Sequence, residues 1–159
     1  KDVCEYLATL RLPEPAGLTG LTVAYHAACS LQHGQKIVRQ PKELLSKMGF
    51  AVKDVPEGHL CCGSAGIYNI VHTDIARSLR DRKIARIEQL EPDVIAAGNI
   101  GCITQIATGT AIPVVHPVEL IDWASGGPRP EGVMEHDRGA PARSGQIKPT
   151  AATADIARV

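Results

Sequence analysis

Four short apolar runs, each followed by a loop and then by a helix-like stretch, divide the first 124 residues of the chain. The runs cover residues 21–25, 50–55, 93–97 and 113–116. The third run is apolar almost throughout, as expected for a strand that is buried on both faces of a sheet. The repeated order of strand, loop and helix predicts an α/β domain with a mostly parallel, Rossmann-like sheet and helices on both faces.

The stretches around these runs have helical patterns. Residues 1–10 carry an apolar face with a helical period, and Asp2 is the expected N-cap. A second helix is expected to begin at Pro41, which suits a first turn, and to end before Gly49. Further helices are expected over residues 73–90, from about residue 102 onward, and over residues 118–123.

The longest of these helices, over residues 73–90, has both an apolar and a charged face. Thr73 is its expected N-cap. Four charged residues, Arg80, Asp81, Arg82 and Glu88, are expected to face solvent. The aliphatic residues expected to face inward are Ile75, Leu79, Ile84, Ile87 and Leu90.

Composition limits the classes of function. The chain is 44% hydrophobic, and its 17 basic residues balance its 17 acidic ones, which gives no electrostatic case for a nucleic acid or an anionic membrane as partner. No apolar run approaches the roughly 20 residues that a membrane helix needs. We expect one domain over residues 1–124 and a disordered or loosely packed tail over 125–159. The chain begins at Lys1 without methionine, so we expect a fragment whose targeting signal cannot be read.

Four of the five cysteines follow the predicted strands. Cys29 follows the first strand, Cys61 and Cys62 follow the second, and Cys102 follows the third. The carboxyl ends of parallel strands meet at one edge of a sheet, so these thiols are expected to lie close together. Nearby glycines would let the backbone approach a bulky group, and helices that begin there would direct N–H groups toward it. Cys4 lies apart and is expected to be structural.

The thiols could serve several kinds of chemistry. The odd number of cysteines, in an α/β pattern that needs no disulfides, indicates a reducing, cytoplasmic compartment. One zinc ion needs four ligands in a tetrahedron, which the adjacent Cys61 and Cys62 suit poorly because neighbouring side chains diverge. A cluster with several irons relaxes this limit, and four thiolates match a [4Fe–4S] cluster. Zinc binding, thiol–disulfide chemistry and the absence of any site remain alternatives.

Other polar residues lie beside the expected site. His26 and His116 end strands, and each could support the site or simply be hydrogen-bonded by loop backbone. Asn99 could cap the helix that begins near Cys102, or fill space beside that cysteine. His59 and His72 are expected at the surface. No residue here is expected to act as an acid–base catalyst.

The cysteine motifs resemble the CCG (cysteine-rich) domain of heterodisulfide-reductase-type proteins. More closely, the chain resembles the iron–sulfur subunits of bacterial glycolate oxidases, over about residues 1–124. The residues that carry this resemblance are 25–35 (YHAACSLQHGQ), 39–41 (RQP), 60–69 (LCCGSAGIYN), 98–102 (GNIGC) and 116–120 (HPVEL).

The resemblance implies the C-terminal part of an electron-transfer subunit with Cys29, Cys61, Cys62 and Cys102 as cluster ligands. Such a subunit passes electrons from a flavin subunit, which holds FAD and oxidises glycolate, toward quinone. The implied partners are that flavin subunit and further iron–sulfur regions, with peripheral attachment to the inner membrane through them.

The sequence also departs from the wider family. Asn99 stands where many members have a further cysteine, so a five-cysteine double cluster is not expected. Ala27 and Ala28 replace the usual Asp-Pro, and Ser30 replaces a frequent histidine. The alternative readings are a heterodisulfide-reductase-like or lactate-utilisation subunit, or a zinc-stabilised interaction module.

Overall fold

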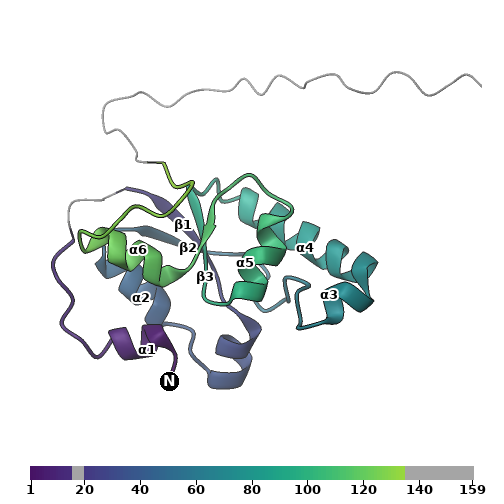
Figure 1. The fold of residues 1–159 in the computed structure, drawn as a ribbon, viewed down its shortest axis with the longest axis horizontal. Helices are drawn as coiled ribbons and strands as arrows, with labels where there is room; N and C mark the ends of the chain where they lie inside the picture. Colours follow the sequence, from purple (N-terminus) through teal and green to yellow (C-terminus); the bar gives the residue numbers. More distant parts are fainter. Residues whose placement is uncertain (16–19, 135–159) are drawn as a thin grey trace, which may run out of the picture.

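The computed structural model describes residues 1–15 and 20–134, and its centre is a four-stranded sheet in which every strand is parallel (Figure 1). The strand order is β2-β1-β3-β4. The strands are β1 (Thr22–His26), β2 (Ala51–Asp54), β3 (Val94–Ala97) and β4 (Val114–Val115). The predicted α/β architecture with a parallel sheet is therefore confirmed.

The two inner strands form the rigid frame of the domain. Val23 pairs with Val52 on one side and with Val94 on the other, which fixes the register of three strands. All four residues of β3 are fully buried, as the continuous apolar run predicted. β2 is an edge strand and is mostly exposed, because only its Val52 packs against the core.

Helices cover both faces of the sheet (Figure 1). One layer comprises α1 (Val3–Leu7), α2 (Gln40–Lys47) and α6 (Pro117–Ala124). The other comprises α3 (Tyr68–Val71), α4 (Thr73–Glu88) and α5 (Ile100–Ala107). A π-helical segment, η1 (Ser30–Gln35), follows β1 and was expected only as a loop or helix start.

Each layer has its own hydrophobic core. Leu45 of α2 and Leu120 of α6 are fully buried on the first face, where the Phe50 and Trp123 rings lie 6.4 Å apart. On the second face, Ile87 of α4 and Ile106 of α5 are fully buried. The second core also includes Cys62 and Cys102, so the cysteine site is continuous with the packed interior.

Helix α4 differs from its predicted orientation. Ile75 was expected to face inward, but it is 53% exposed, so that prediction was wrong. The neighbouring Ala76 takes the inward position, and its backbone lies against Gly63 of the loop after β2. The buried stripe then continues along the helical period through Lys83, Ile84 and Ile87.

The structure describes only the first ten residues of the predicted tail, 125–134. Residues 135–159 of that tail lie outside the described part of the structure. Residues 125–134 are described, and Val133 is buried against the first core. Across residues 1–15 and 20–134, no helix is long and apolar enough to cross a membrane.

Candidate metal centre

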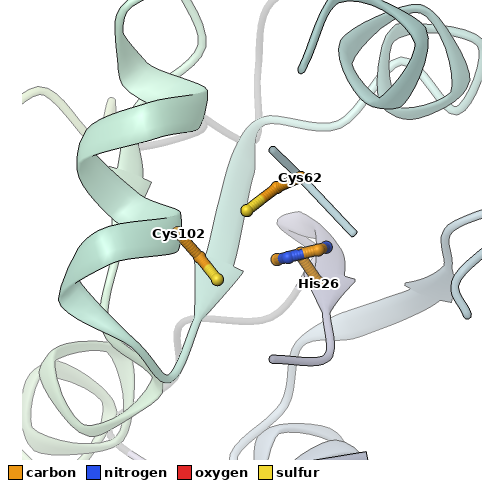
Figure 2. A group of neighbouring side chains, drawn as sticks. All are labelled: His26, Cys62 and Cys102. Carbon is orange, nitrogen blue, oxygen red and sulfur yellow. The ribbon is translucent and has the colours of Figure 1, made fainter. Parts of the chain in front are cut away.

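The cysteine site is built from loops that leave the carboxyl ends of β1, β2 and β3. β1 ends at His26, three residues before Cys29, and the first turn of α5 carries Cys102 just beyond β3. Donor atoms of His26, Cys62 and Cys102 lie within 4.8 Å of one another (Figure 2). Figure 2 shows the two sulfur atoms and the imidazole directed into the same space. The sequence prediction that these loops meet at one edge is in agreement with this arrangement.

The adjacent thiols of Cys61 and Cys62 have different neighbours. Cys61 interacts with the thiol of Cys29, and both side chains are only partly buried. The backbone N–H of Gly63 donates to Cys61 Sγ at 3.3 Å. Burial and the neighbouring Cys61 raise the pKa of Cys29 to about 11. The four thiols therefore form two pairs, an outer pair of Cys29 and Cys61 and an inner pair of Cys62 and Cys102. The two pairs interact electrostatically with each other.

The thiols of Cys62 and Cys102, the inner pair, are hydrogen-bonded to each other. Cys62 is 1% exposed, and its pKa is lowered because the thiol of Cys102 donates to it, with further support from His26 and from the N–H of Ser64. The same hydrogen bond, together with burial, raises the pKa of Cys102. A buried thiolate held by hydrogen-bond donors is a prepared metal ligand.

His26 occupies an unusual position for a histidine. Its side chain is 1% exposed, and neither ring nitrogen has a hydrogen-bond partner of full geometry. The alternative that loop backbone satisfies this histidine is therefore wrong for His26. His116 instead caps α6, because its Nδ1 accepts from Val118 N at 3.2 Å. Its backbone N–H donates to Glu119 Oε1 at 2.8 Å and completes a capping box.

Asn99 takes the helix-capping role that was one of its two alternatives. Its Oδ1 accepts from Gly101 N at 3.0 Å and from Cys102 N at 3.3 Å. This cap holds the first turn of α5 at the sheet edge and so positions the Cys102 side chain. His59 and His72 are exposed, as expected.

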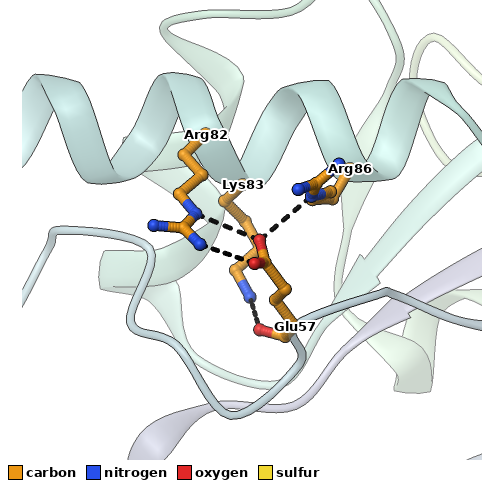
Figure 3. Close-up of polar contacts among 4 residues, drawn as sticks. All are labelled: Glu57, Arg82, Lys83 and Arg86. Atoms are coloured by element: carbon orange, nitrogen blue, oxygen red, sulfur yellow. Dashed lines mark hydrogen bonds and ion pairs between the residues drawn. The ribbon is translucent and has the colours of Figure 1, made fainter.

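Lys83 is a buried lysine that interacts electrostatically with the cysteines and was not predicted from the sequence. Its side chain is 2% exposed, and its Nζ donates to the Glu57 carbonyl oxygen at 2.8 Å (Figure 3). Burial lowers the pKa of Lys83, while Cys62 and Cys29 act in the opposite direction. Lys83 lies seven residues after the buried Ala76 on the same helix face, and no pattern in the sequence marks either residue as buried.

Glu57 ties the loop that carries Cys61 to helix α4. Its carboxylate accepts from Arg82 Nε and Arg86 Nε, each at 3.0 Å (Figure 3). These two arginines lower the pKa of Glu57 from its ordinary 4.5 to about 2. Arg82 was expected to face solvent. Its side chain is exposed, although it also makes this contact with Glu57.

We expect Glu57 to make the domain sensitive to acid. The folded-state pKa is depressed, so the stabilisation is present above the unfolded pKa and is lost as pH falls from about 4.5 toward about 2. Glu57→Gln should lower the free energy of unfolding at neutral pH and flatten its fall across this window, as measured by urea denaturation. Glu43→Gln, which removes an exposed carboxylate paired with Arg39, is the control and should leave the pH profile unchanged. An identical acid profile for wild type and Glu57→Gln would contradict the prediction.

Parallel strands, a glycine-rich sheet edge and converging thiols define the class of this protein as a cysteine-rich α/β domain. The family model described as "Cysteine-rich domain" (CCG) matches residues 23–107, and the chain belongs to this family. The match includes Cys29, Cys61, Cys62 and Cys102.

Curated relatives match the chain over much of its length. It is 43% identical over 123 residues to the glycolate oxidase iron-sulfur subunit of Escherichia coli K12. The aligned residues are 77% of this chain and 30% of that protein. A probable glycolate oxidase iron-sulfur subunit of Bacillus subtilis is 31% identical over 116 residues, covering 68% of this chain and 26% of that protein. Lactate utilization protein A of Anoxybacillus flavithermus is 30% identical over 104 residues, which are 62% of this chain and 44% of that protein. The chain thus spans less than half the length of each of these relatives.

Proposed function

We propose that residues 1–124 form an iron–sulfur domain in the electron-transfer subunit of a glycolate oxidase complex, with Cys29, Cys61, Cys62 and Cys102 as the cluster ligands. The observation that carries the proposal is the meeting of these thiols at one sheet edge, with Cys62 prepared as a thiolate. The similarity to proteins named glycolate oxidase iron-sulfur subunits supports the same conclusion.

The surroundings of the thiols fit an anionic cluster. Cys102 lies in the first turn of α5, where the positive end of the helix dipole stabilises negative charge. The buried side chain of Lys83 interacts electrostatically with Cys62 and Cys29, which favours negative charge on these thiols. Gly63, at φ +91°, brings the loop backbone close to α4. Four thiolates match a [4Fe–4S] cluster, which supplies one-electron transfer when bound.

The complete protein would pass electrons from a flavin-containing partner subunit, which binds FAD, toward quinone. This domain needs no acid–base residue for that role, because the flavin carries out the chemistry on the 2-hydroxy acid. Aliphatic side chains directly after the Cys61–Cys62 loop are exposed and suit contact with the remainder of the complex: Ile67, Ile70, Val71 and Ile75. The complex would lie in the cytoplasm, peripheral to the inner membrane through its partners.

The second candidate function is a zinc-stabilised interaction module. The arrangement of His26, Cys62 and Cys102 within 4.8 Å favours it, because two thiolates and an imidazole are common zinc ligands. The iron–sulfur proposal is preferred because the adjacent Cys61 and Cys62 have different thiol neighbours, which several metal atoms accommodate better than one tetrahedral zinc ion does.

Metal analysis of the protein tests the proposal directly. We expect anaerobically purified protein to contain about four irons and about four acid-labile sulfides per chain, the content of a [4Fe–4S] cluster. Zinc without iron or sulfide would support the interaction module. No metal in a folded sample, even after incubation with iron and sulfide, would exclude both candidates.

The substrate is tested in the complete complex. Electron transfer should be fastest with glycolate as the donor to the flavin subunit. A preference for lactate would support a lactate-utilisation role, and reduction of a mixed disulfide would support a heterodisulfide-reductase-like role. Each of these outcomes leaves the metal analysis of this domain unchanged.

A further inference from the structure

We propose that the ammonium group of Lys83 is the buried counter-charge of the metal centre and raises its reduction potential. The inference rests on the proposed function, because it requires an iron–sulfur cluster held by the four cysteines. It follows from the burial of one lysine, from the partner of its hydrogen bond and from its place beside the thiols.

Lys83 lies in the interior of the domain, where a charged side chain is rare. It is 2% exposed, and Ile84 and Ile87 beside it on helix α4 are buried as well. Within residues 1–15 and 20–134, no other lysine, arginine or carboxylate side chain is buried. A buried ammonium is costly unless negative charge lies beside it, so its place needs a counter-charge.

The hydrogen bond of Lys83 does not supply that counter-charge. Its Nζ donates to the backbone carbonyl oxygen of Glu57 at 2.8 Å, which is a neutral group (Figure 3). The carboxylate of Glu57 accepts from Arg82 and Arg86 instead. The bond therefore fixes the position of the ammonium against the loop that carries Cys61, while two other cations already neutralise the carboxylate.

The cysteines provide the remaining negative charge. Lys83 and Cys61 line the same hollow between this loop and helix α4. Cys62 and Cys29 oppose the lowering of the Lys83 pKa by burial, and each does so more than Glu57 does. Metal binding requires every ligand thiol to lose its proton, so the loaded centre presents more negative charge to Lys83 than the empty site. Lys83 should thus be protonated in the loaded protein.

This charge acts on the reduction potential because reduction makes the centre more negative. The effective dielectric constant is low in a protein interior, and salt screens buried charges little. An ammonium in this place therefore stabilises the reduced centre more than the oxidised centre. Net charge is one of the properties that set the potential of iron–sulfur clusters, so Lys83 should raise it.

Reduction potentials of variants at this position test the inference. The full chain would be purified anaerobically and titrated with dithionite, with the reduced centre followed by EPR. Lys83→Met keeps the length of the side chain and removes its charge, so the equilibrium constant for reduction should fall at least about tenfold, which is about 59 mV for one electron. Lys83→Arg retains the charge and should have a potential close to that of wild type.

Two further variants separate the buried charge from other effects. Lys53 is the matched control, because its Nζ also donates to a backbone carbonyl oxygen, that of Leu90 at 2.9 Å, but it is exposed. Lys53→Met should leave the potential unchanged. Lys83→Gln keeps a hydrogen-bond donor without the charge and should have a lower potential, as Lys83→Met does. The difference between wild type and Lys83→Met should persist at high salt, since a buried charge is not screened.

Iron and labile sulfide, measured in each variant, distinguish the failure of this inference from that of the proposed function. Equal potentials in wild type and Lys83→Met would overturn the inference alone, and so would a wild-type potential in Lys83→Gln when that of Lys83→Met is lowered. Loss of iron from both Lys83→Met and Lys83→Arg, with the fold retained by circular dichroism, would make Lys83 a packing residue and overturn it too. Loss of iron from Lys83→Met but not from Lys83→Arg would support it. Folded wild type that holds zinc or no metal would overturn both proposals.

Discussion

Replacing Cys62 with serine should remove the iron and sulfide from the domain and leave its α/β fold intact. Cys62 is the buried thiol whose pKa is lowered by Cys102, His26 and the N–H of Ser64. Its sulfur lies within 4.8 Å of donor atoms of both His26 and Cys102. A serine hydroxyl of similar size remains protonated and is a poor ligand for iron. We expect the iron content to fall by at least about tenfold. Even the replacement of a residue that only orients a metal ligand lowers metal affinity by about 10–100-fold.

The matched control for this experiment is Cys4→Ala. Cys4, a residue of α1, is buried in the other core, and burial raises its pKa to about 12, as expected for an inert structural thiol. This variant also removes one cysteine, but it should retain the iron and sulfide of wild type. Iron and labile sulfide are measured chemically, and circular dichroism reports the fold. Full iron content in Cys62→Ser would exclude Cys62 as a required ligand.

Gly63→Ala should destabilise the whole domain, and this is the largest effect on stability that we expect. Gly63 has φ +91°, and a Cβ at this position would overlap with the backbone of Ala76 in α4. Overpacking costs about 1–3 kcal/mol, and a left-handed conformation adds about 1–2 kcal/mol for a residue with a side chain. The two costs add to about 2–5 kcal/mol, a large part of the stability of a typical domain, about 5–15 kcal/mol.

Urea denaturation of the metal-free protein measures this loss without interference from a bound metal. Gly34→Ala is the control, because nothing lies within 4 Å of the added Cβ and the backbone of Gly34 is not left-handed. It should change the free energy of unfolding by less than about 1 kcal/mol. Equal stability of the two variants would show that the loop moves away from Ala76 at little cost.

The sheet and the meeting of the cysteines could be predicted from sequence because they depend on general rules. Apolar runs of strand length marked all four strands, and the rule that parallel strands end at one edge brought Cys29, Cys62 and Cys102 together. The divergence of adjacent side chains also anticipated the separate neighbours of Cys61 and Cys62. The ligand roles themselves stay predictions until the metal is analysed.

Features that depend on packing between elements could not be predicted. Ile75 was assigned inward from the apolar pattern, but the contact of Gly63 with Ala76 sets the rotation of α4. The same rotation buries Lys83, although its neighbours in sequence are charged and exposed. His26 has no sequence signal beyond its place at a strand end, since its missing partners are visible only in three dimensions.

The origin of the four thiols in three separate loops restricts the order of events when the protein is made. Cys29, Cys61–Cys62 and Cys102 are far apart in the chain, and the register of β1, β2 and β3 alone brings them together. A peptide that contains any one loop cannot reproduce the site, unlike a metal motif contained in one short segment. Metal binding therefore requires the assembled sheet, so a bound metal should add to the stability of the folded domain.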